Sequence, residues 1–135
     1  MSSIKEIKLA QKIAIEQQQV VLELNTLVAD IERCEKTILG LKSELETVNR
    51  KHQNRQTTRD DIAYLEDLLR CAKKKLAWEK HIASLQKRTP ALLERISGFM
   101  MDPKIPPADE VRVQMVNALQ SVQAAMERLQ NVKVN

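Results

Sequence analysis

VVLELNTLVADIERCEKTILGLKSELETV, residues 20–48, is the stretch that decides the fold class. Its apolar side chains recur at alternating intervals of four and three positions over four heptads, which is typical of a helix with one apolar row. The row consists of Val20, Leu24, Leu27, Ile31, Cys34, Ile38, Leu41, Leu45 and Val48. A helix over residues 4–50 would be roughly 70 Å long at about 1.5 Å per residue. Because no compact domain of this size has so long an interior, we expect it to pair with other helices along its length.

The composition also favours an all-α fold. The 135 residues include one Phe, one Trp, one Tyr and two Gly. Aliphatic side chains must therefore supply the buried area that aromatic ones usually provide, and the Gly-containing turns of β-hairpins are missing. We predict a long coiled-coil N-terminal helix followed by two or three shorter helices, in an extended helical bundle completed by partner subunits.

Breaks in the apolar pattern divide the chain into five segments. These are a heptad helix over 1–50, a polar hinge over 51–60, basic helices over 61–101, a proline loop over 102–107 and an amphipathic helix over 108–135. The hinge lacks aliphatic side chains, and the three prolines of the loop forbid a continuous helix. Thr89 and Pro90 resemble a helix start, since Thr caps helices and Pro favours their first position. We therefore expect a separate short helix from Pro90 to about Met100.

The later helices carry apolar rows of their own. In the second helix, Ile62, Leu65, Leu69, Ala72 and Leu76 form one row, which Leu68, Cys71, Trp78, Ile82 and Leu85 extend or flank. In the last helix, the row comprises Met115, Leu119, Val122, Met126 and Leu129. We predict that this last row and the row of residues 20–48 bind partner helices, with the register set by flanking charges and by polar row positions such as Gln17.

The basic middle of the chain allows three interpretations. Residues 51–90 hold 10 basic and 5 acidic side chains, and they account for the formal net charge of +4. The cluster in the second helix comprises Arg70, Lys73, Lys74, Lys75 and Lys80. A solvated helix face is the favoured interpretation, and a patch for an acidic protein surface, such as the acidic tails of tubulin, is the second. Nucleic acid is the least favoured partner, because no interleaved aromatic residues or recognition fold accompany the charges.

Candidates for catalysis or metal binding are few. His52 and His81 have no acid or cysteine at metal-ligand spacing, and Cys34 occupies a position of the apolar row. With two glycines, the chain lacks a Gly-rich phosphate loop. We expect no enzyme activity, no cofactor and no metal. Two reduced cysteines, the lack of an apolar signal segment and the lack of a membrane-spanning run predict an intracellular protein without membrane contact.

The stretch from Arg95 to Leu129 adds a resemblance. The residues that carry the resemblance are, in chain order, Arg95, Met100, Pro106, Met115, Val116, Leu119, Glu127, Arg128 and Leu129. They match the pattern of a known family in the same order and without a gap. This pattern resembles the second-subunit family of the augmin (HAUS) complex, a hetero-octamer that recruits γ-tubulin ring complexes to existing microtubules. The proline loop is the most specific part of the match, since heptads alone would not produce it.

The resemblance implies a structural role without catalytic residues. Its partners would be the other coiled-coil subunits of the complex and, indirectly, γ-tubulin complexes and microtubules. The function would be microtubule-dependent nucleation during mitotic spindle assembly, in the cytoplasm at the spindle and centrosome. Two alternatives remain. One is a subunit of a kinetochore or other cytoskeletal coiled-coil scaffold, and the less favoured one is a nucleic-acid-binding helical module using residues 50–80.

Overall fold

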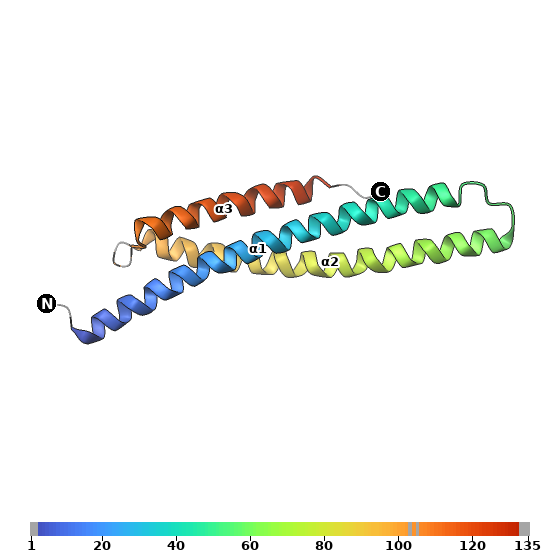
Figure 1. Ribbon diagram of the computed structural model, residues 1–135. Helices are drawn as coiled ribbons and strands as arrows, with labels where there is room; N and C mark the ends of the chain where they lie inside the picture. The colour runs from blue at the N-terminus through green and yellow to red at the C-terminus, as the bar shows by residue number, and fades with distance from the viewer. Residues whose placement is uncertain (1–2, 103, 105, 133–135) are drawn as a thin grey trace.

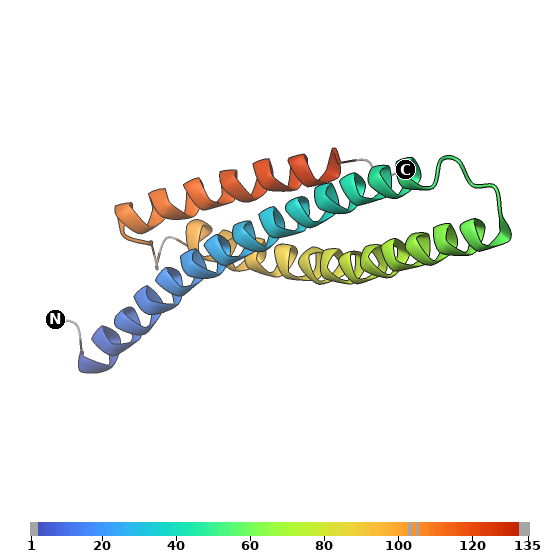
Figure 2. The same ribbon diagram turned by 45° about the vertical axis from the view of Figure 1, so that its right-hand side comes forward.

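The computed structural model describes residues 3–102, 104 and 106–132, which are entirely helical apart from the connections (Figure 1). The helices are α1 (Ile4–Lys51), α2 (Thr58–Met101) and α3 (Asp109–Gln130). α2 turns back along α1, and α3 then runs beside α1 in the direction of α1 (Figures 1 and 2). Both later helices pack on α1 and hardly touch each other. The all-α prediction is therefore confirmed.

Local sequence signals explain where the first two helices begin. Ser3 caps α1 by accepting a hydrogen bond from the backbone N–H of Glu6, whose carboxylate accepts one from the N–H of Ser3. Thr57 and Asp60 form the same reciprocal arrangement at the start of α2. Each capping box satisfies backbone donors that would otherwise have no partner. The turn between α1 and α2 occupies residues 52–57, inside the polar stretch.

α1 is the central element of the core. Its heptad row is buried apart from Leu45, which is half-buried, and Leu24, Leu27 and Ile31 are fully enclosed. α2 contributes an inner row that has the same alternating spacing. The buried or half-buried members of this inner row are Tyr64, Leu68, Cys71, Trp78, Ile82, Leu85, Leu92, Ile96 and Phe99.

α3 buries a slightly different row from the predicted one. Met115, Val122 and Leu129 are buried as part of the core, whereas Leu119 and Met126 are only half-buried. Ala118 and Ala125 are buried instead. α3 is thus turned so that Ala118 and Ala125 face the core, and Leu119 and Met126 lie at its edge.

The expected helix start at Pro90 is wrong, because α2 continues through it to Met101. The Thr89 hydroxyl donates a hydrogen bond to the carbonyl of Leu85 at 2.8 Å, one turn earlier in the same helix, so it does not act as a cap. Pro90 itself is exposed. Contacts of α2 with α1 on both sides of Pro90 thus outweigh the cost of a proline inside a helix, about 3 kcal/mol.

Candidate helix-binding surfaces

The two rows predicted to bind partner helices lie inside the chain. Every member of the α1 row and of the α3 row is buried or half-buried. The helices packed on these rows are the chain's own, since both α2 and α3 contact α1. Val21 and Val28 widen the apolar face of α1, which gives room for two neighbours. A partner must therefore use other surfaces of this conformation.

The predicted basic patch is divided between two surfaces. Lys74 Nζ lies 2.8 Å from Glu44 Oε2, and Arg70 pairs with both Glu44 and Asp67. The hydrogen bond from Lys74 lowers the pKa of Glu44. Lys73, Lys75 and Lys80 are exposed and form no ion pair with any described residue. Two members of the patch thus hold α2 to α1, and three remain at the surface.

A polar cluster at the α1–α2 turn includes the buried His52. His52 Nε2 lies 2.7 Å from Asp67 Oδ2, and the Arg70 guanidinium lies 2.7 Å from the other oxygen of Asp67. The hydrogen bonds from His52 and Arg70 lower the pKa of Asp67 to about 2. Tyr64 packs edge-on against His52. These contacts hold the turn in place, and the ring of His52 is engaged with Asp67.

Replacing Asp67 should change how the fold responds to acid. Its pKa is about 2 in the fold and 3.8 ordinarily, so its stabilising contribution is complete above about pH 4 and is lost as the pH falls towards 2. We expect Asp67→Asn to lower the free energy of unfolding at pH 7 and to flatten its decline between pH 4 and 2. Urea unfolding across this pH range measures both effects. Asp109→Asn is the control, and an equal acid response of the two variants would contradict the prediction.

The row predicted first for α2 faces outward. Ile62, Leu65, Leu69 and Leu76 are 52%, 61%, 56% and 54% exposed, and Ala72 is exposed with them. Contacts distant in sequence determine this orientation of α2. The indole N–H of Trp78 donates to the carbonyl of Cys34 at 2.9 Å, and Arg88 reaches Asp30 at 2.7 Å. An apolar surface two heptads long is therefore left at the outside of α2.

The first turns of α1 form a second uncovered surface. They extend beyond the other two helices, as the N-terminal end of the ribbon shows in Figures 1 and 2. Leu9, Ala10, Ile13 and Ala14 line one side of a hollow of about 590 Å³ there. The connection to α3 lines the other side with Pro106 and Ala108, and the first turn of α3 adds Val111. The hollow thus presents mainly apolar side chains on the same face of α1 that is buried further along the helix.

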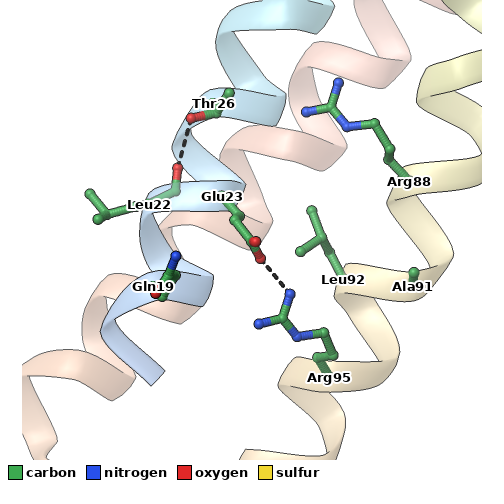
Figure 3. Close-up of a pocket in the computed structure, with 8 residues that line it drawn as sticks. All are labelled: Gln19, Leu22, Glu23, Thr26, Arg88, Ala91, Leu92 and Arg95. Atoms are coloured by element: carbon green, nitrogen blue, oxygen red, sulfur yellow. Dashed lines mark hydrogen bonds and ion pairs between the residues drawn. The ribbon is translucent and has the colours of Figure 1, made fainter. Parts of the chain in front are cut away.

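A second hollow, of about 360 Å³, lies between α1 and α2 (Figure 3). In the close-up, Glu23 and Arg95 point toward each other across it and form an ion pair. Arg88, also at its wall, is paired with Asp30. The charged groups therefore neutralise one another between the helices, and they do not converge on a space where a substrate would react.

Both cysteines are buried. Burial raises the pKa of the Cys34 thiol and of the Cys71 thiol, which disfavours the reactive thiolate. Among the described residues, no three His, Cys, Asp or Glu side chains gather in a way that would hold a metal ion. None of the described helices has the length and apolar character needed to cross a membrane.

No protein-family model, curated protein or solved structure matches the sequence.

Proposed function

We propose that this chain is a structural subunit of a hetero-oligomeric helical complex and that it binds a partner helix at the uncovered first turns of α1. The observation that carries the proposal is the apolar face of Leu9, Ala10, Ile13 and Ala14, where Ile13 is half-buried and the other three side chains are exposed. An isolated helix of about a dozen residues is marginally stable in water. A partner helix would bury this face and stabilise the segment.

The position of the hollow supports a helical partner more than a small ligand. The apolar face of α1 lies in line with the buried row that begins at Gln17 and Val20. A helix placed there would therefore extend the packing of the core beyond the ends of α2 and α3. Pro106 and Val111 form a wall for it on the other side. Helix-in-groove recognition uses this combination of an apolar groove and an extended contact.

The resemblance of the C-terminal quarter supports an augmin-type complex as the assembly. In that role the α1–α2 hairpin would act as a spacer, and the uncovered end would join the chain to its neighbouring subunits. The complete assembly would recruit γ-tubulin complexes to existing microtubules and so promote microtubule nucleation in the spindle. The chain's contribution would be shape and contact surface, without a chemical step.

Affinity purification from dividing cells, with detection by mass spectrometry, tests the proposal. The tagged wild-type chain should recover the other augmin-type subunits in near-equal amounts, with γ-tubulin as a weaker companion. The double variant Leu9→Asp/Ile13→Asp should lose at least about 90% of that recovery, because it places two charges on the binding face. Ile15→Asp is the matched control, since Ile15 is 62% exposed and lies on the opposite side of the same helix.

Two results would contradict the proposal. Recovery of centromere proteins in place of the augmin-type set would show that the complex is a different one. Equal recovery by the double variant and by Ile15→Asp would show that the first turns of α1 are not the binding surface. Far-UV circular dichroism of the purified variants verifies that each retains the wild-type helix content.

A further inference from the structure

The outer row of α2, which comprises Ile62, Leu65, Leu69, Ala72 and Leu76, is the other uncovered apolar surface of the chain's described part. It is distinct from the surface of the proposed function, because it lies along α2 near the α1–α2 turn. Its intervals of three, four, three and four residues match those of the buried rows, and all five side chains are exposed. Such spacing places one apolar stripe along a helix, the geometry needed for side-by-side packing with another helix.

Acidic residues flank the first half of the outer row, and lysines flank its second half. Glu66 and Lys73 flank it on one side, and Asp61 and Lys75 flank it on the other. On each side the acid comes first and the lysine follows. Glu66, Lys73 and Lys75 are exposed and form no ion pair among the described residues, whereas Asp61 contacts Arg55. Over residues 61–75 the flanking charges therefore change from acidic to basic, while Arg59 precedes the row and Lys80 follows it.

This change of charge along the outer row indicates which partner binds there. We infer that the outer row binds a second copy of this chain, with the two α2 helices antiparallel. In that orientation Glu66 of each copy lies opposite Lys73 of the other, so symmetry forms two identical ion pairs. The same register places Leu65 against Leu76 and Leu69 against Ala72 of the other copy. A two-fold interface of this kind is self-complementary and closed.

A parallel pair of α2 helices would place like charges together. Flanking positions five residues apart meet across a parallel helix pair. Asp61 would then face Glu66 of the other copy, and Lys75 would face Lys80. Repulsion at both ends thus disfavours the parallel pair. In the antiparallel pair Glu66 and Lys73 attract each other within the outer row, and the one like-charge pair, Arg59 with Lys80, lies beyond its ends, where both side chains are exposed.

The antiparallel pair has a consequence for the shape of the assembly. The outer row lies near the turn between α1 and α2, and the uncovered first turns of α1 lie at the far end of the chain (Figure 1). Two copies joined at their outer rows would therefore extend in opposite directions. The result is an elongated particle with one uncovered α1 end at each extremity, and each end is available to a further helix.

Sedimentation equilibrium of the purified full-length chain tests the inference. The wild type should change with rising concentration from the 15.5 kDa chain to twice that mass. Leu69→Asp, in the centre of the outer row, should remain a monomer throughout. Leu22→Asp is the matched control, because Leu22 is also exposed, at 66%, but lies on α1. A wild-type chain that stays monomeric, or a Leu69→Asp variant that still dimerises, would overturn the inference.

Charge exchange tests the antiparallel orientation. Glu66→Lys should raise the dimer dissociation constant about tenfold, because two attractive pairs become repulsive. Adding Lys73→Glu should restore dissociation to within about threefold of the wild type, since each pair is then reversed but attractive. In a parallel dimer, Glu66→Lys would instead create attraction to Asp61 and tighten association. Tightening, or a double variant that fails to recover, would overturn the antiparallel arrangement.

Discussion

The Leu27→Asp variant is expected to lose the cooperative fold of the isolated chain. Leu27 is fully buried in α1 and belongs to the row on which the other helices pack. An unpaired carboxylate there costs several kcal/mol, which is comparable with the total stability of about 5–15 kcal/mol for a domain. Thermal unfolding followed by circular dichroism should show a broad, early transition or none. A cooperative transition at the wild-type temperature would contradict the burial of this row.

Two comparison variants make the result specific. Leu22→Asp changes an exposed leucine five residues away on α1 and should alter stability by no more than about 0.5 kcal/mol. Leu41→Asp should be strongly destabilising, because Leu41 is 4% exposed in the same row as Leu27. Both buried variants should also prevent assembly with partners. The spectrum of the chain alone separates the two causes, because loss of a partner contact would leave the isolated fold intact.

The sequence predicted the buried face of α1 well but could not identify the helices that cover it. An unbroken row such as Leu24, Leu27 and Ile31 shows that a side of the helix is apolar. It contains no information on whether the covering helix belongs to the same chain. That depends on the direction of the chain after the turn at residues 52–57, which contacts such as Asp67 with His52 stabilise.

The orientation of α2 was harder to predict because α2 has two apolar rows. The row of Ile62, Leu65 and Leu69 is the more aliphatic one, yet it lies outside. The inner row contains Cys71 and Trp78, and the indole N–H of Trp78 donates a hydrogen bond to a backbone carbonyl 44 positions earlier in the chain. A local pattern cannot reveal such a partner. The outer row was therefore identified as apolar, but its exposure, and hence its availability for binding, required the structure.

The Pro90→Ala variant is expected to be more stable than the wild type, by about 1–3 kcal/mol. Pro90 lies inside α2 and has no backbone N–H, so the carbonyl of Gln86 lacks its usual partner in the helix. Alanine supplies that donor and removes the clash between the proline ring and the preceding turn. Because Pro90 is exposed, the change removes no core contact. Urea unfolding at pH 7 measures the gain.

Pro107→Ala is the matched control for this stabilisation. Pro107 precedes α3, outside any helix interior, so its replacement supplies no missing helical hydrogen bond. It also gives the unfolded chain more freedom, and the expected result is no gain or a small loss. If Pro90 instead began a separate helix, its fixed φ would favour that start, and Pro90→Ala would be neutral or destabilising. The sign of the change at Pro90 thus decides between one continuous α2 and two shorter helices, and with it whether the outer row and the C-terminal end of α2 move as one rigid element.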